Sequence, residues 1–347
     1  MTLPPISIVL TAVGCPGAST LIRMLKANGE RDIAIHGVDM RRDAVGRFMC
    51  DGFDLVPAGS SPDYIATLAA VVEKVHPDVL FVQSSHEIEV IAEHRDTFEA
   101  LGTRVLADGV DGIRIAGDKA LMHAVCQGIP VPQPELLMPE TLDEFSAGAR
   151  KLGYPDVPVC FKPPVAKGSR GFRILSAHVD RVHDLLRERP INRYMTLADF
   201  EDLFRDVRPF PRLMLMEYVD EPEITVDLFA QKGEILLHQV RTREQVLTGL
   251  AMAFKTIERP ELVELTRKVV RSLALDYFQS VQWIGGRLLE INPRVSTFVY
   301  QEDFIIPYLG IKHALGELDA EGAALAQSKV RLSRRSVRYY DQVFWDE

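Results

Sequence analysis

The stretch LLEINPR, residues 288–294, decides how the second half of the chain folds. Glu290 and Asn292 stand two positions apart, so on a strand their side chains point to the same face. Pro293 cannot continue a strand ladder, so the strand should end there and leave both oxygen ligands accessible. Magnesium prefers such carboxylate and amide oxygens, completed by phosphate and water. The stretch predicts a magnesium-binding strand end, with a plain polar end before an Asn-Pro turn as the alternative.

A hairpin is predicted around this strand, from QSVQWIGGRLLEIN at 279–292. If the two glycines at 285–286 form a two-residue turn, Val281 lies opposite Glu290 and Gln282 faces away. A three-residue loop with a bulge instead brings Gln282 to the face of Glu290. The residues alone leave both registers open.

A second polar element lies upstream. Lys162 ends the apolar run VPVCFK, and the small basic loop AKGSRG at 166–171 leads directly into another strand, FRIL at 172–175. Backbone amides and Lys or Arg side chains in such a loop can face triphosphate oxygens. The loop lacks GxxxxGK[ST] and opens no helix, so it is not a P-loop. Taken alone, it is equally consistent with an exposed hairpin loop.

The first part of the chain predicts a parallel sheet. Short β-branched runs at 6–11, 34–39 and 78–83 alternate with amphipathic stretches, including one near 88–101, and this βαβ alternation is typical of a Rossmann-like domain. The turn Gly14-Cys15-Pro16-Gly17 is not a full GxGxxG, because Pro16 removes an amide. A nicotinamide dehydrogenase is therefore the weakest interpretation.

The pattern changes after this part. A helix near 118–127 ends at Gly128, as glycine commonly ends helices, and a polar helical insert is expected near 180–208. The predicted class is α/β followed by α+β, with a Rossmann-like N-terminal domain in front of two lobes. The expected boundaries are 1–115, 116–212 and 213–347.

Composition indicates a globular protein of more than one unit: 347 residues, 47% hydrophobic and 26% charged, with a mean hydropathy of +0.01. The net charge of -9 argues against a general binder of nucleic acid or of anionic membranes. The four cysteines form no CxxC pair, which fits reduced thiols. The N-terminal apolar run is too short for a signal or a membrane span. A cytoplasmic protein is expected.

Taken together, the ordered motifs resemble those of the ATP-grasp superfamily, in particular the halves of the carbamoyl-phosphate synthase large subunit and its small stand-alone relatives. The motifs are GDK at 117–119, GIPVP at 128–132, FKP with KGSRG within 161–171, MEYVDEPEITVD at 216–227, SVQW at 280–283 and LEINPRVS at 289–296. They extend over almost the whole chain. The resemblance implies a Rossmann-like domain followed by two lobes that hold ATP between them.

The resemblance also implies a ligand for each motif, with ATP and Mg²⁺, or Mn²⁺ in its place, as cofactors. The residues implied to bind ATP are Lys119, Lys162, Lys167, Gly168, Ser169, Glu217, Tyr218, Val219 and Glu223. Lys119 and Lys162 would contact phosphates, and the hinge at 217–219 would hold adenine through backbone groups. Glu223 would accept the ribose hydroxyls. The implied metal ligands are Gln282, Glu290 and Asn292.

Several polar residues are candidates for the substrates. Arg294, with Lys162, is expected to be catalytic, because it lies just beyond the metal strand and can neutralise a developing acyl phosphate. Arg241 and Arg243 follow the strand EILLHQV and are candidates for an anionic substrate. The remaining candidates follow a strand of the N-terminal sheet, at the edge where ligands usually bind: Ser84, Ser85, His86 and Glu87.

The chemistry implied by the family is transfer of the γ-phosphoryl group to a carboxylate, followed by capture of the acyl phosphate by an amine. The leading hypothesis is an ADP-forming carboxylate-amine ligase with small-molecule substrates, and a homodimer is expected from the family. Two alternatives stay open. One is a carbamoyl-phosphate-synthase-like subunit that phosphorylates bicarbonate or carbamate. The other is a non-catalytic ATP-binding regulatory protein, which would have no need to keep Lys162, Glu290 and Asn292 together.

Overall fold

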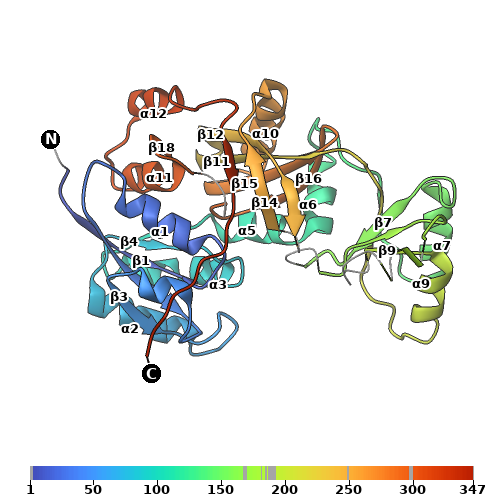
Figure 1. The fold of residues 1–347 in the computed structure, drawn as a ribbon, viewed down its shortest axis with the longest axis horizontal. Coiled ribbons are helices and arrows are strands. Elements are labelled where there is room, and N and C mark those ends of the chain that lie inside the picture. The colour runs from blue at the N-terminus through green and yellow to red at the C-terminus, as the bar shows by residue number, and fades with distance from the viewer. Residues whose placement is uncertain are drawn as a thin grey trace.

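The computed structural model describes residues 3–166, 170–180, 182–183, 186, 193–247, 250–296 and 300–346. Figure 1 shows a sheet with its helices at the lower left, a β-rich body above it and a small lobe that projects to the right. The predicted class, a parallel-sheet domain followed by a two-lobed α+β region, is confirmed. No helix in these ranges is long and apolar enough to cross a membrane.

The N-terminal sheet is five-stranded and parallel, in the order β3-β2-β1-β4-β5. Its strands are β1 (Ile6–Leu10), β2 (Ile33–Asp39), β3 (Gly52–Leu55), β4 (Val79–Phe81) and β5 (Arg104–Leu106). Its helices are α1 (Ala18–Lys26), the 3-10 helix η1 (Val45–Phe48), α2 (Tyr64–Val75), α3 (Ile88–Glu93), α4 (Arg95–Glu99) and α5 (Val110–Gly117). Ile8 and Leu10 enter one core and Val9 another, because alternate side chains face opposite sides of the sheet. The single helix predicted near 88–101 is wrong, since His94 divides it into α3 and α4.

The small lobe is a second five-stranded sheet, in the order β6-β10-β7-β8-β9. Its elements are β6 (Leu136–Leu137), α7 (Leu142–Lys151), β7 (Val159–Lys162), β8 (Arg173–Leu175), β9 (Tyr194–Met195), α9 (Leu197–Phe204) and β10 (Met214–Glu217). Phe145 of α7 stacks on Phe200 of α9 with ring centroids 3.8 Å apart, and Phe161 of β7 packs edge-on against both. A helical insert was predicted near 180–208, of which residues 181, 184–185 and 187–192 lie outside the described part of the chain. The described remainder holds the strand β9, which pairs with β8, as well as α9.

The large lobe is built on an antiparallel sheet in the order β12-β11-β15-β16. Its elements are α6 (Lys119–Cys126), β11 (Glu223–Gln231), β12 (Glu234–Thr242), α10 (Pro260–Ser272), β15 (Tyr277–Ile284) and β16 (Arg287–Asn292). Pro260 opens α10 at a position where its missing amide hydrogen is no loss. Trp283 of β15 is fully buried and donates to Thr266 of α10 at 3.1 Å, which fixes the helix on the sheet.

The remaining elements connect the large lobe to the N-terminal sheet. They are β13 (Glu244–Leu247), β14 (Leu250–Lys255), β17 (Tyr300–Gln301), β18 (Phe304–Ile305), α11 (Ile306–Ala314), α12 (Ala320–Gln327) and β19 (Arg335–Val337). The C-terminal part holds the two helices α11 and α12. One hydrophobic core joins the two regions, with Phe81 of β4 packed on Phe278 of β15 at 5.2 Å between ring centroids. The site below lies where these regions meet the small lobe.

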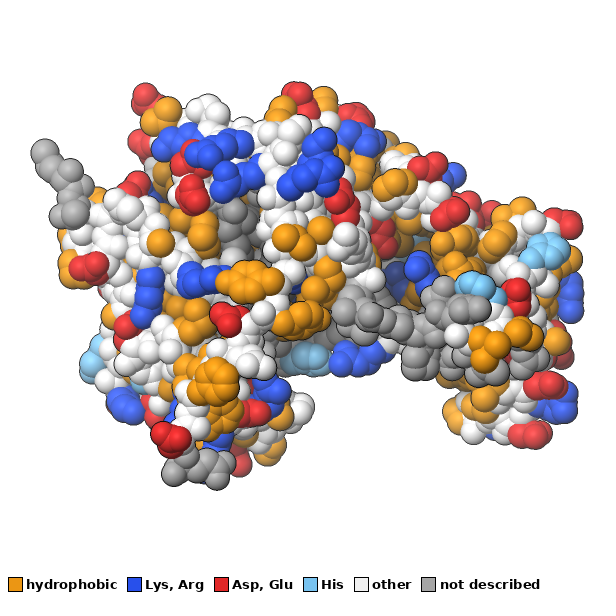
Figure 2. Space-filling model, in the orientation of Figure 1, with side chains coloured by type: hydrophobic (Ala, Val, Ile, Leu, Met, Phe, Trp, Pro, Cys, Tyr) orange, Lys and Arg blue, Asp and Glu red, His pale blue; other side chains and the backbone are white. Residues whose placement is uncertain are grey.

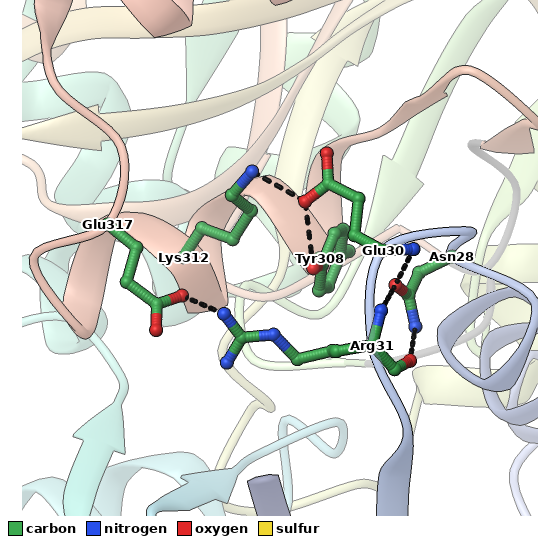
Figure 3. A network of polar contacts seen from close by, with 6 residues as sticks. All are labelled: Asn28, Glu30, Arg31, Tyr308, Lys312 and Glu317. Atoms are coloured by element: carbon green, nitrogen blue, oxygen red, sulfur yellow. Dashed lines mark hydrogen bonds and ion pairs between the residues drawn. The ribbon is translucent and has the colours of Figure 1, made fainter. Parts of the chain in front are cut away.

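A polar network closes this connection at the far end of the sheet (Figure 3). Glu30, in the turn before β2, accepts hydrogen bonds from Lys312 at 2.6 Å and from Tyr308 at 3.0 Å, both on α11. Its neighbour Arg31 forms an ion pair with Glu317, and the Arg31 side chain is fully buried. The network therefore fixes α11 on the turn before β2.

Candidate active site

The hairpin of β15 and β16 combines features of the two predicted registers. Ile284 pairs with Arg287 around a two-residue glycine turn, but Leu289 is an extra residue on β16 that forms a bulge. Beyond the bulge Gln282 pairs with Glu290, and Val281 pairs with Ile291 inside the core. The bulge, not the turn length, therefore places Gln282 and Glu290 side by side.

Glu290 is the centre of charge of the site. Its Oε1 accepts a hydrogen bond from Asn292 Nδ2 at 3.1 Å, and its Oε2 lies 3.6 Å from Lys119 Nζ. Burial opposes ionisation of this carboxyl, but the charges of Lys119 and Lys162 outweigh it and lower the pKa of Glu290 to about 2. Burial in turn lowers the pKa of Lys162, which Glu290 partly restores. An ionised carboxylate, two amides and two lysines are thus gathered around one point.

Lys119 connects the two lobes at this point. Asp118 caps α6 by accepting the amide hydrogens of Ala120 and Leu121, so the helix begins at Lys119 with its side chain toward Glu290. Lys119 Nζ also donates to the carbonyl of Ala166 at 3.0 Å, at the start of the basic loop. The predicted loop residues Lys167, Gly168 and Ser169 lie outside the described part of the chain.

An apolar cluster lies beside these charges, between the small lobe and β16. Its buried members are Ala120, Cys160, Ile174, Met214 and Met216, with Leu136, Phe172, Tyr218 and Leu289 packed against them. Such a surface suits the flat, apolar faces of an adenine ring. The implied adenine hinge at 217–219 indicated this region, but Leu289 and Phe172 were missed. The bulge places Leu289 against this cluster, and no feature of the sequence indicated that bulge.

The predicted hinge and ribose residues already have partners. The amide of Glu217 donates to the carbonyl of Glu135 at 3.1 Å, and its carboxylate lies 3.2 Å from Arg287. Tyr218 donates to Asp220 at 3.4 Å. Val219, one position further, lies next to the turn glycine Gly285.

Glu223 at the start of β11 forms an ion pair at 2.7 Å with Arg243, which directly follows the neighbouring strand β12. The Arg243 guanidinium is also close enough to Glu290 to contribute to its low pKa. A ligand that used Glu223 for its hydroxyls would therefore meet Arg243 as well.

Arg241 lies deeper than its neighbour. Its Nε donates to Asp227 at 2.5 Å and its Nη2 to Ser296 at 2.8 Å, with both charged side chains only 3% exposed. The predicted substrate role of Arg241 would require it to leave this internal pair.

Arg294 reaches from the end of β16 to the N-terminal sheet. Its Nε donates to Ser85 Oγ at 2.9 Å, so the polar run after β4 lies against the residue that follows Asn292 by two positions. Figure 2 shows the small lobe standing apart from the N-terminal sheet, with an open notch between them. The predicted phosphate and metal residues in the described ranges therefore converge, and Arg294 connects them to the N-terminal run.

Two family models match this chain. Residues 209–336 match "ATP-grasp in the biosynthetic pathway with Ter operon", and residues 8–106 match "PylC-like, N-terminal domain". The large chain of carbamoyl phosphate synthase from Thermus thermophilus is 24% identical over 310 residues, which cover 81% of this chain and 28% of the synthase. The chain thus spans about a quarter of the length of that relative.

Solved structures share the fold. Biotin carboxylase from Campylobacter jejuni, in a β,γ-ATP complex, superposes with a TM-score of 0.66 at 18% identity, over 91% of this chain and 72% of that one. The biotin carboxylase domain dimer of 2-oxoglutarate carboxylase from Hydrogenobacter thermophilus, with MgADP and bicarbonate, gives a TM-score of 0.64 at 17% identity, over 90% and 70%. The family models and the sequence relative confirm the prediction made from the motifs: the chain contains an ATP-grasp domain with a PylC-like domain in front of it, and it is homologous to the carbamoyl phosphate synthase large chain.

Proposed function

We propose that this protein is an ADP-forming ligase that phosphorylates a carboxylate with ATP and joins the acyl phosphate to an amine. The observation that carries the proposal is the convergence of Lys119 and Lys162 with Glu290, Asn292 and Gln282 between the two lobes. Two cations suit phosphate oxygens, and three oxygen-bearing side chains suit a magnesium ion that phosphate and water complete.

The donor chemistry fits that metal. Glu290 is ionised at any physiological pH, because its pKa is about 2. Asn292 donates to one Glu290 oxygen and so orients the carboxylate, while Gln282 holds an amide beside it across the hairpin. Bound magnesium would neutralise phosphate charge as the γ-phosphoryl group is transferred.

The residues of the chain would position ATP and the carboxylate and neutralise the phosphate charge. Lys119 and Lys162 would balance the charge of the triphosphate as they now balance that of Glu290, and the cluster around Met214 and Met216 would receive adenine. Arg294 would face the phosphoryl group as it moves to the carboxylate, since it follows the metal strand directly. The attacking and leaving groups are both substrate oxygens, so none of these steps needs a protein nucleophile.

The relatives support both the leading function and one alternative. The structural neighbour from Hydrogenobacter thermophilus was solved with MgADP and bicarbonate, and the homologous synthase chain is named for carbamoyl phosphate. Bicarbonate or carbamate is thus a second candidate for the phosphorylated acid. A regulatory protein without turnover is less favoured, because the lysines and the ligand set are kept together.

The oligomeric state, the cellular compartment and the alternative metal are also part of the proposal. A homodimer is proposed because one structural neighbour is described as a dimer. All four cysteines are free thiols, which suits the reducing cytoplasm proposed here. Manganese is proposed as a substitute for magnesium, because both accept oxygen ligands.

The test is ADP release by the purified protein with magnesium and ATP, across a panel of carboxylates, including bicarbonate, each tested alone and with amines. The proposal expects one acid-amine pair to stimulate ADP release and yield an amide. Stimulation by bicarbonate alone would favour the synthase-like alternative. ATP binding with no stimulation by any pair would favour the regulatory one.

A further inference from the structure

One buried carboxylate on the N-terminal sheet has an oxygen that the protein does not use. Glu87, just before α3, is 8% exposed, and its Oε2 has no hydrogen-bond partner among the described residues. A buried carboxylate oxygen left in this way costs free energy unless a ligand or water satisfies it. Glu87 can therefore accept a further hydrogen bond from a ligand, besides any from the hydroxyls that lie beside it.

Among the described residues, the groups that act most strongly on the Glu87 carboxyl include no cation. The hydroxyls of Thr11, at the end of β1, and Tyr64, at the start of α2, lie beside its carboxylate, and the charge of Asp39 at the end of β2 opposes its ionisation. The Cys15 thiol of the loop after β1 also feels the charge of Glu87, while burial raises its own pKa. Burial raises the pKa of Glu87 to about 7, and the two hydroxyls only partly offset this effect.

Glu87 also lies close to the reacting end of the proposed site. Arg294 donates to Ser85, two residues before Glu87, and Arg294 follows the metal ligand Asn292 by two residues. Cys15 is within electrostatic reach of both Arg294 and Glu87, so all three belong to one neighbourhood. The edge of the parallel sheet where ligands bind therefore meets the metal strand at this point.

We propose that Glu87 binds the amine substrate as an ammonium ion through its unused oxygen and takes the proton that the amine must lose before it attacks. The inference rests on the proposed ligase function and names the nucleophile as a primary amine that enters from the N-terminal sheet. Ammonium N–H groups are donors that the Oε2 atom of Glu87 can accept from a ligand. Arg294 is the nearby cation, and it is directed to Ser85 and the phosphoryl side.

The proton transfer balances. The carboxylate of Glu87 takes one proton from the ammonium ion, which leaves a neutral amine and a neutral carboxyl group. The amine lone pair then attacks the acyl carbon, a C–N bond forms, and the C–O bond to phosphate breaks with its electron pair on the phosphate. The second amine proton passes to phosphate or water. A group that titrates near neutral pH is suited to this task.

The experiment compares two nucleophiles in the wild-type protein and in Glu87→Gln, with magnesium, ATP and the carboxylate found in the panel above. Hydroxylamine is uncharged at neutral pH and traps an acyl phosphate without a base, whereas the amine needs one. We expect Glu87→Gln to form hydroxamate at close to the wild-type rate and to lose about a hundredfold in amide formation. The wild-type amide rate should rise with pH through about 7, with no such inflection in the variant.

Two further variants control the result. Glu87→Asp keeps the carboxylate and should keep the pH inflection at a reduced rate, which a purely structural role would not predict. Glu89→Gln, two residues further along in α3 and paired with Arg114 at the surface, should behave as wild type. Equal loss of both products in Glu87→Gln, or an unchanged amide rate, would overturn the inference. A wild-type protein that forms no hydroxamate would contradict the ligase function itself.

Discussion

The buried ion pair of Arg241 and Asp227 allows a sharp test of how the large lobe is held together. We predict that Arg241→Met strongly destabilises the lobe, because it leaves the Asp227 carboxylate charged and without its cation. Both side chains are 3% exposed, and Asp227 Oδ1 already has no partner in the described structure. The substitution also removes the donor to Ser296 and the guanidinium over the Phe254 ring at 5.7 Å.

The expected magnitude follows from this burial. Removing one partner of a buried pair typically costs about 3–5 kcal/mol, since the remaining charge stays desolvated. The matched control is Arg271→Met, because Arg271 pairs with Glu234 at 2.8 Å but the two side chains are 63% and 50% exposed. An exposed pair contributes about 0–1 kcal/mol, so the two variants should differ by about 3 kcal/mol.

The assay is urea unfolding followed by tryptophan fluorescence, in which the buried Trp283 of the same sheet reports the loss of the lobe and the exposed Trp345 contributes a background. The double variant Asp227→Leu with Arg241→Met should recover most of the loss, because it removes the orphaned charge as well. If Arg241→Met costs no more than Arg271→Met, the pair does not stabilise the lobe and Arg241 is available to a substrate.

Three other outcomes are expected. Lys162→Ala and Glu290→Ala should each lower ADP release by at least about a hundredfold with little change in the thermal midpoint, because both side chains face the proposed ATP site; near-wild-type turnover in either purified variant would sink that assignment. Phe145→Ala should cost about 3–5 kcal/mol in urea unfolding, because it removes a fully buried ring stacked on Phe200; a loss below about 1 kcal/mol would contradict the packing. Burial lowers the pKa of His238 from 6.5 to about 4, so the native state resists protonation of this imidazole. The resulting contribution to the free energy of unfolding, up to about 3 kcal/mol, is present above pH 6.5 and is lost as the pH falls through 4. His238→Gln should flatten the dependence of stability on pH in this window, and an unchanged dependence would show that the imidazole is not held neutral.

Much of the fold was predictable because its signals are local. The βαβ alternation of the first 115 residues gave the parallel sheet, since period and strand composition are read directly from the chain. The break at His94 and the strand β9 were missed, because neither interrupts the local pattern strongly. Pairing of β9 with β8 is a tertiary contact that overrides propensity in a polar segment.

The site residues also divide into those that a local pattern identifies and those that depend on tertiary structure. Glu290 and Asn292 were found because a two-residue spacing on a strand fixes their common face. The residue that pairs with Glu290 across the hairpin could not be decided from the sequence. A one-residue bulge at Leu289 reverses the face of every earlier position on β16, and no residue type marked that bulge. The contact of Arg294 with Ser85 joins residues 209 positions apart, so only the assembled fold reveals it.

The central claim is that ATP phosphorylates a carboxylate at the site of Lys162 and Glu290. The most direct measurement follows the carboxylate oxygen atoms of the acid substrate. The acid is labelled with heavy oxygen and supplied with the amine and ATP, and the released inorganic phosphate is analysed by mass spectrometry. Transfer through an acyl phosphate predicts one labelled oxygen in each phosphate released, at the same rate as ADP forms. Unlabelled phosphate, with the amide still formed, would contradict the account.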